Sequence, residues 1–154
     1  MGLRNDYLEE TSKFLLKHRF LGVFPYDLFP INVKMSKKPV SFIINLDKSS
    51  DPGSHFVCIY IDKEKLEYMD SYGMEPFLPR IKNFVRTQAK KKKYIFNEKM
   101  IQKLDSRFCG YYCLGFLLSK DLKMSMKKFI SNFPDVLHND KKIERFILKC
   151  IDLY

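Results

Sequence analysis

The sequence predicts an α+β fold, because segments with strand character gather in the middle of the 154-residue chain and segments with helical character flank them. Val40 to Leu46 and His55 to Ile61 are rich in β-branched and aromatic residues and are bounded by turn-forming residues. An apolar content of 45% is ample for a hydrophobic core. We therefore expect one domain that spans residues 1–154.

The N-terminal part of the chain predicts one helix and one loop. Asn5 or Asp6 can cap a first helix that carries Leu8 on its apolar stripe. His18 has the position of a surface or helix-end histidine. The segment Phe20 to Pro30 is predicted to be an aromatic loop, punctuated by proline, that packs over the core.

The two central strands are predicted to continue into a hairpin. Glu64 to Asp70 returns as a strand after a two-residue turn at Asp62 and Lys63. With this turn, His55 lies directly opposite Asp70 on one face of the hairpin, with Cβ atoms about 4.5–5.5 Å apart.

The remaining elements follow from turn residues and from apolar residues at helical spacing. They are a surface loop (Asp47 to Ser54), a helix (Pro76 to Ala89), an exposed loop (Lys90 to Lys93), a short strand (Tyr94 to Phe96), a helix (Ser125 to Phe133) and a last helix capped by Asn139 or Asp140.

The stretch from Gln102 to Cys113 reads Q-K-L-D-S-R-F-C-G-Y-Y-C and leads into an apolar segment. It predicts a buried helix from Phe108 to Ser119 with Cys109 in its first turn. Asp105 or Ser106 is the expected N-cap. The positive end of a helix dipole stabilises a thiolate over a thiol, so Cys109 is a candidate nucleophile.

A histidine beside a carboxylate is the arrangement that a general base needs, because the carboxylate orients the imidazole. His55 and Asp70 fulfil this condition in the predicted hairpin. Glu75 is a weaker candidate, because it lies beyond Gly73 and has the wrong parity in an unbroken hairpin. The alternative interpretation of His55 is a strand-edge histidine that is hydrogen-bonded to the backbone.

Gln102 precedes the cysteine by seven residues and is a candidate oxyanion donor. Its side-chain amide and the backbone N–H of Cys109 could converge on a carbonyl oxygen. Such a group, together with the cysteine at a helix start and the His55–Asp70 pair, indicates nucleophilic catalysis.

Four cysteines in a lysine-rich chain without an apolar signal segment indicate a reducing compartment and free thiols. Cys109 and Cys113 lie four residues apart, which is also a spacing for a metal pair. Zinc would need two further ligands, so the sequence favours Cys113 as a buried core residue and predicts no metal site. No apolar run is long enough to span a membrane.

The net charge of +10 is concentrated between Arg80 and Lys103, where nine basic residues and one acidic residue give +8. This concentration predicts an anionic partner, above all nucleic acid. The equally weighted alternative is a solvated helix face followed by a lysine loop. The candidate contacts are Arg80, Lys82, Arg86, Lys90, Lys91, Lys92 and Lys93.

Taken together, these residues resemble the adenovirus maturation protease (adenain) and its relatives encoded by Polinton/Maverick elements and virophages. The chain order His, Asp, Gln, Cys is that of this group and of SUMO-specific proteases. The matching landmarks are Phe20–Gly22 (F-L-G), Phe29-Pro30, Ile44-Asn45, Gly53–Phe56 (G-S-H-F), Tyr68–Gly73 (Y-M-D-S-Y-G), the Gln102 to Cys109 interval and Cys109–Cys113 (C-G-x-x-C).

The resemblance implies a central mixed sheet of about five strands with the cysteine helix packed against it. It also implies a thiol endopeptidase in which Cys109 is the nucleophile, His55 the general base, Asp70 its orienting group and Gln102 the oxyanion donor. The expected substrates are capsid or core precursors of a virus or virus-like element, and no cofactor is required for the chemistry. We expect a monomer located in the virion and in the host nucleus or cytoplasm.

Two departures from that family bear on activation. Phe56 follows the histidine, where these proteases usually have Trp. The stretch Lys90 to Glu98 lacks the cysteine through which an activating viral peptide is disulfide-linked in the adenovirus enzyme. Disulfide activation is therefore not expected, whereas assistance by DNA is compatible with the basic segment. The alternatives are a protease that removes SUMO or a similar modifier, and an inactive DNA-binding module with the same fold.

Overall fold

The computed structural model describes residues 4–33, 38–47 and 55–153. Its centre is a five-stranded mixed sheet with the strand order β1-β2-β3-β4-β5, in which β1–β2 and β4–β5 are parallel and the two inner pairs are antiparallel. The strands are β1 (Arg19–Pro25), β2 (Val40–Asn45), β3 (Phe56–Ile61), β4 (Lys65–Met69) and β5 (Lys93–Phe96). The predicted α+β class with a five-stranded mixed sheet is confirmed.

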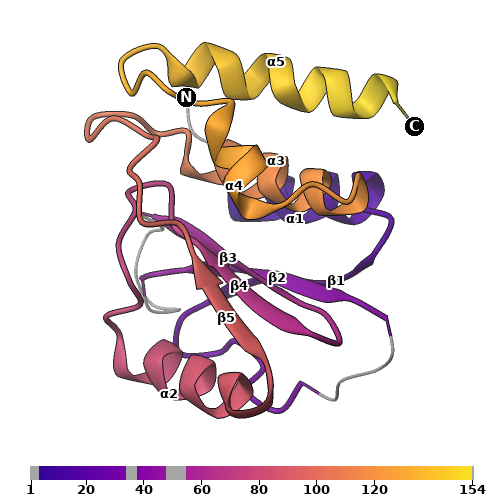
Figure 1. Cartoon of the computed structure of the whole chain (residues 1–154), viewed down its shortest axis with the longest axis vertical. Helices are drawn as coiled ribbons and strands as arrows, with labels where there is room; N and C mark the ends of the chain where they lie inside the picture. Colours follow the sequence, from indigo (N-terminus) through magenta and orange to yellow (C-terminus); the bar gives the residue numbers. More distant parts are fainter. Residues whose placement is uncertain (1–3, 34–37, 48–54, 154) are drawn as a thin grey trace.

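Helices cover both faces of the sheet unequally (Figure 1). One face carries α3 (Cys109–Asp121), with α1, α4 and α5 around it, and the other face carries α2. Their bounds are α1 (Asn5–Leu15), α2 (Pro79–Gln88), α4 (Met126–Ser131) and α5 (Asn139–Asp152), and a short 3₁₀ turn, η1 (Ala89–Lys91), follows α2. The core is therefore divided into two apolar layers by the sheet.

The prediction of an aromatic loop is wrong in its first part, because Arg19–Pro25 forms the edge strand β1. Gly22 has φ +140, and the register with β2 shifts between Phe20 and Val23. A bulge interrupts the alternation of side chains along a strand, and proline is tolerated at a sheet edge. Both features hide the strand in the sequence pattern.

The predicted hairpin turn is also wrong. Cys58 pairs with Met69 and Ile61 with Leu66, so the register differs by two residues from that of a two-residue turn. Asp62 extends the turn, since its Oδ1 accepts the backbone N–H groups of Glu64 (2.8 Å) and Lys65 (2.9 Å). A shift of two residues keeps every side chain on the predicted face of the sheet.

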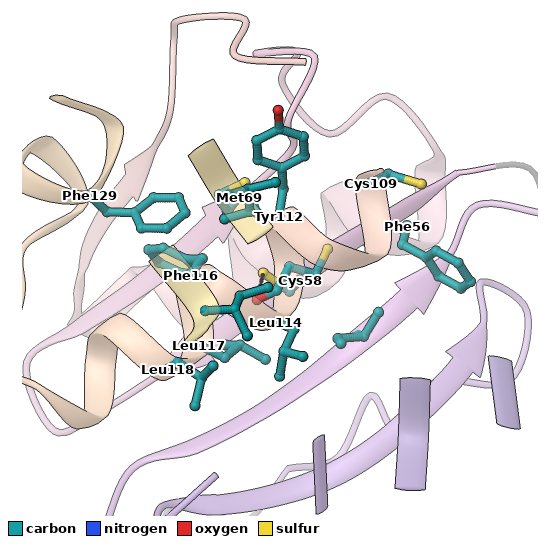
Figure 2. Packing of buried hydrophobic residues seen from close by; sticks show 14 of the residues in the cluster. Phe56, Cys58, Met69, Cys109, Tyr112, Leu114, Phe116, Leu117, Leu118 and Phe129 are labelled. Atoms are coloured by element: carbon teal, nitrogen blue, oxygen red, sulfur yellow. Dashed lines mark hydrogen bonds between the residues drawn. The ribbon is translucent and has the colours of Figure 1, made fainter. Parts of the chain in front are cut away.

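Helix α3 is buried almost all round, as its sequence predicts (Figure 2). Leu114, Leu117 and Leu118 belong to the apolar layer between the helix and the sheet. On its other side, Gly115 lets α5 approach, because a Cβ atom there would lie 2.5 Å from Cδ1 of Ile143. This burial fixes the position of the helix start, where Cys109 lies.

The predicted N-caps of three helices are wrong. The N-cap positions are Arg4 in α1, Phe108 in α3 and His138 in α5, and none of them makes a side-chain cap hydrogen bond. Ser106 instead accepts the N–H of Phe108 at 3.1 Å, one residue ahead of the helix. Phe108, the N-cap residue next to Cys109, therefore offers no side-chain acceptor to the first backbone N–H groups of α3.

The loop that precedes α3 is tied to α5 by a buried asparagine. Asn139 donates from Nδ2 to the carbonyl groups of Ile101 (2.9 Å) and Phe133 (3.0 Å), and no part of its side chain is exposed. Because Gln102 follows Ile101 directly, this contact fixes the backbone where the candidate oxyanion donor begins.

Gly73 should be indispensable for the loop that follows β4. It has φ +73, and a Cβ atom there would lie 2.6 Å from the backbone N of Met100. We expect Gly73→Ala to lower the free energy of unfolding by at least about 2 kcal/mol, from the left-handed conformation and the backbone clash together.

Urea denaturation with Gly73→Asn as the second variant separates the two causes. Asparagine tolerates a positive φ but has the same Cβ atom, so we expect it to be less destabilising than alanine but still below the wild type. Wild-type stability of Gly73→Ala would contradict this prediction.

No helix among the described residues is long and apolar enough to cross a membrane.

Candidate active site

His55 and Asp70 meet where β3 begins and β4 ends. The Nε2 atom of His55 lies 2.7 Å from Oδ1 of Asp70, and the two side chains are 11% and 2% exposed. The predicted contact is therefore confirmed, although the register makes the two residues diagonal rather than opposite neighbours. Glu75 is exposed, and the carboxylate that contacts the imidazole is that of Asp70.

The Asp70 carboxylate is held by its surroundings before any substrate binds. Its Oδ1 also accepts the backbone N–H of Tyr72 at 2.9 Å. Asn97 at the end of β5 accepts the backbone N–H of Asp70 at 2.9 Å and donates to the Asp70 carbonyl group. Its amide also donates to the Lys99 carbonyl group at 3.3 Å. Asn97 is 3% exposed, so it is a buried positioning residue that the sequence analysis did not identify.

The Cys109 side chain lies at the N-terminal end of α3 and is 6% exposed (Figure 2). It belongs to the same apolar layer as Phe56, the residue that follows His55 at the start of β3. Phe56 is buried in this layer, whereas the ring that stacks on the imidazole is that of Tyr72.

The pKa of His55 is raised from 6.5 to about 9. Burial alone lowers this pKa, but the hydrogen bond to Asp70, the interaction with the nearby Cys109 thiol and the negative charges of both groups outweigh it. Nδ1 of His55 is buried and has no hydrogen-bond partner of ordinary geometry among the described residues. The raised pKa favours the protonated ring at neutral pH, with Nε2 on the carboxylate and Nδ1 left for the thiol.

Gln102 is fully buried, and its side-chain amide is fixed at both ends. Oε1 accepts a hydrogen bond from the Ser71 hydroxyl group, and Nε2 donates to the Ser106 carbonyl group at 2.9 Å. An amide NH₂ carries two hydrogens, so one N–H is committed to Ser106 and a second remains. Ser71 and Ser106 are further positioning residues that sequence reasoning missed.

The face of the imidazole is covered by Tyr72, which the sequence analysis also missed. The two rings stack with centroids 4.4 Å apart and an interplanar angle of 17°. The Tyr72 hydroxyl donates to the Leu104 carbonyl group at 3.4 Å. The observed register, extended past the ends of β3 and β4, puts Tyr72 opposite His55, so the correct turn length was the signal that would have identified it.

Tyr72→Leu should lower kcat/KM by about tenfold, because a ring stacked on a cationic imidazole stabilises it by roughly 1–2 kcal/mol. The alkaline limb of the pH profile should move to lower pH in this variant, since the imidazolium form loses that stabilisation. Tyr72→Phe keeps the ring and should behave like the wild type. Equal losses in both variants would assign the effect to the hydroxyl group instead.

Gln102→Ala should lower kcat by about 10²–10³ with little change in KM, as expected for the loss of one oxyanion donor. Ser71→Ala is the matched control, because it removes the partner of Oε1 and leaves both N–H groups of Gln102 in place. We expect less than a tenfold loss for that control. A rise in KM with unchanged kcat in Gln102→Ala would contradict the oxyanion role.

The basic segment lies on the opposite face of the sheet from α3, along α2, η1 and the start of β5 (Figure 1). Two of its seven candidate residues make structural contacts: Arg80 donates to the Phe29 carbonyl group at 2.9 Å, and Lys92 donates to the Asp62 carbonyl group at 2.7 Å. The exposed members are Lys82, Arg86, Lys90, Lys91 and Lys93. Nucleic-acid binding by this surface stays a prediction.

All four cysteines are buried and free of disulfides. Burial raises the pKa of the Cys150 thiol to about 11 and also raises the pKa of Cys113. Both groups therefore stay protonated at neutral pH. Within the part of the chain that the structure describes, no group of three or more His, Cys, Asp or Glu side chains could hold a metal ion.

The chain resembles known proteins in sequence and in fold. No family model matches the chain. A protein of Acanthamoeba polyphaga mimivirus named "Putative thiol protease" is 32% identical in an alignment 122 residues long, which covers 65% of this chain and 40% of the mimivirus protein. The chain thus spans less than half of that relative.

Two solved structures share the fold. The ASFV pS273R protease aligns with a TM-score of 0.55 and 19% identity, over 73% of this chain and 43% of the protease. ChlaDub1 from Chlamydia trachomatis aligns with a TM-score of 0.53 and 17% identity, over 73% of this chain and 59% of ChlaDub1. The specific resemblance to adenain stays a prediction. The chain shares sequence with a viral protein named as a thiol protease and has the fold of the ASFV pS273R protease.

Proposed function

We propose that this chain is a cysteine endopeptidase in which Cys109 is the nucleophile, His55 the acid and base, Asp70 the orienting carboxylate and Gln102 the oxyanion donor. The observation that carries the proposal is the contact of 2.7 Å between Nε2 of His55 and Asp70, next to a thiol at the start of a buried helix; the raised pKa of His55 agrees with it. Catalytic hydrogen bonds are often long in a free enzyme, so an unbonded Nδ1 fits this role.

The first half of the reaction forms a thioester. The Cys109 thiolate attacks the carbonyl carbon of the scissile bond, and the oxyanion accepts hydrogen bonds from Gln102 Nε2 and the backbone N–H of Cys109. The C–N bond then breaks while the His55 imidazolium protonates the departing amine. In the second half, neutral His55 takes a proton from water, the hydroxide cleaves the thioester, the carboxylic acid is released, and the Cys109 thiolate and the His55 imidazolium are restored.

We further propose that the substrates are capsid or core precursors of a virus or virus-like element, which makes the virion and the infected cell its sites of action. The mimivirus relative supports a viral setting. The alternative proposal is a protease that acts on SUMO or ubiquitin-like conjugates. The fold that the chain shares with ChlaDub1 is compatible with this alternative. Activation by a peptide or by DNA, and the monomeric state, belong to the same proposal.

The test compares precursor polypeptides with SUMO and ubiquitin conjugates as substrates of the purified chain, with Cys109→Ala as the blank. Cleavage of precursors alone supports the proposal, and cleavage of modifier conjugates alone refutes its substrate class. An inactive nucleic-acid-binding module would cleave neither.

Iodoacetamide labelling at neutral pH distinguishes that last case from a missing substrate. We expect fast labelling confined to Cys109, and slow labelling in His55→Ala, because the imidazolium stabilises the thiolate. Equal labelling of all four cysteines would contradict the proposed ion pair.

A further inference from the structure

A second concavity lies at the opposite end of α3 from Cys109. It has a volume of about 350 Å³ and is formed by the segment between α1 and β1, the start of β1, the residues just before β2, the end of β3, and the end of α3 with the turn that follows it. The thirteen residues of α3 separate its two ends by about 18 Å. The cavity is therefore distinct from the candidate active site.

The walls of this cavity are strongly cationic. Five basic side chains line it, namely Lys17, Arg19, Lys38, Lys120 and Lys123. They come from three parts of the chain that are far apart in the sequence, so their convergence is a property of the fold.

The carboxylates near these cations are already engaged. Asp121 accepts the backbone N–H of Lys17 at 2.7 Å and contacts Nδ1 of His18 at 2.7 Å. Glu67 lies behind Lys120, with Oε2 2.7 Å from Nζ, and the two side chains are 1% and 4% exposed. The basic side chains that line the cavity therefore outnumber these two carboxylates. An anion beside Arg19 and Lys123 would leave the buried pair of Lys120 and Glu67 in place.

His18 serves as a rigid part of the wall. Its side chain is 5% exposed, Nδ1 contacts Asp121, and Nε2 lies 2.6 Å from Oγ of Ser41 in β2. Both ring nitrogens are thus occupied by the protein, and the ring packs edge-on against Tyr60 at 5.3 Å. The histidine thus joins the segment between α1 and β1 to β2 and to the end of α3.

The backbone at Lys123 is unusual for a lysine. With φ 61 it is the non-glycine residue in the left-handed region among the described residues, at the turn that ends α3. Glycine is the ordinary residue at such a helix end, because a Cβ atom costs about 1 kcal/mol there. A lysine in this position is consistent with a function for its charge.

We propose that this cavity binds a compact, multiply phosphorylated small molecule. Several Lys and Arg side chains around one cavity match several phosphate oxygens, because Arg donates in pairs and Lys acts as a compact charge. A cavity of about 350 Å³ suits a small ligand, whereas extended nucleic acid would fit the row of exposed basic side chains along α2 and η1 better. The proposal does not depend on the protease activity.

Isothermal titration calorimetry of the full chain with sodium tripolyphosphate tests the proposal. Arg19→Gln/Lys123→Gln removes two charges from the cavity, and Lys90→Gln/Lys91→Gln removes two from the basic segment as a matched control. We expect the first variant to bind at least about tenfold more weakly, and the control to stay within about twofold of the wild type.

The outcomes are distinguishable. No binding by the wild-type chain, or equal weakening in both double variants, would overturn the proposal. A single-stranded oligonucleotide that competes with tripolyphosphate and loses affinity only in the Lys90/Lys91 variant would identify the ligand as nucleic acid and would overturn it as well.

Lys123→Gly gives an independent check that does not depend on a loss of stability. Glycine relieves the left-handed strain, so the melting temperature without ligand should rise by about 2–4 °C. Tripolyphosphate binding should weaken as much as in Lys123→Gln. Wild-type affinity in Lys123→Gly would exclude Lys123 as a ligand and refute the cavity as it is proposed here.

Discussion

Cys109→Ser should lower kcat/KM for peptide cleavage by at least about 10⁴-fold, the largest effect that we expect from any single substitution. A serine hydroxyl group is far less acidic than a thiol, so the ion pair with His55 that we propose as the start of the reaction should be lost. The two side chains are nearly equal in size, and the buried start of α3 should therefore remain folded.

The matched control is Cys150→Ser in α5. This thiol is 3% exposed and belongs to the same apolar layer, but burial raises its pKa and it has no part in the proposed reaction. We expect a lower melting temperature with unchanged kcat/KM for the molecules that stay folded. Measurable turnover by Cys109→Ser, or an equal loss in Cys150→Ser, would refute the assignment of the nucleophile.

Asp70→Asn should have the second largest effect, a loss of about 10³–10⁴ in kcat/KM with a changed pH profile. The Asp70 carboxylate holds Nε2 of His55 at 2.7 Å and is a main reason why the pKa of His55 is raised to about 9. An amide keeps the shape but removes the charge. The imidazole should therefore lose its proton at lower pH, and the alkaline limb of kcat/KM should move down from about pH 9.

The raised pKa of His55 also makes the free energy of unfolding depend on pH. Because the folded-state pKa of His55 is about 9 and the unfolded value is 6.5, the protonated imidazole stabilises the folded chain fully below about pH 6.5. This contribution, on the order of 2–3 kcal/mol, is lost as the pH rises through about 9. Urea denaturation at pH 6.5 and pH 9.5 should show the loss in the wild type and a smaller one in Asp70→Asn. The same pH dependence in both proteins would contradict the role of Asp70.

The parts of this fold that could be predicted from sequence are those in which local pattern and burial agree. β2, β3 and α3 are strongly apolar and are bounded by turn residues, and their predicted and observed bounds differ by two residues or fewer. β1 could not be predicted in this way, because Gly22 and Pro25 are typical of loops until a parallel neighbour pairs with them. The surface loop predicted for Asp47 to Ser54 lies for the most part outside the described residues.

For the candidate site, the sequence by itself determined which chemical groups were available: a thiol at a helix start, a histidine and a carboxylate on one face of a hairpin, and an amide ahead of the thiol. Side-chain parity survives a register shift of two residues, and this is why His55 and Asp70 were paired correctly despite the wrong turn.

Only the tertiary structure decided what surrounds these groups. Three features depend on register and on contacts between segments that are distant in the chain. They are the stacking of Tyr72 on His55, the hydrogen bonds between Asn97 and Asp70, and the cationic cavity beside Lys123. Such contacts are set by how whole elements pack, and no local pattern of residues encodes that packing.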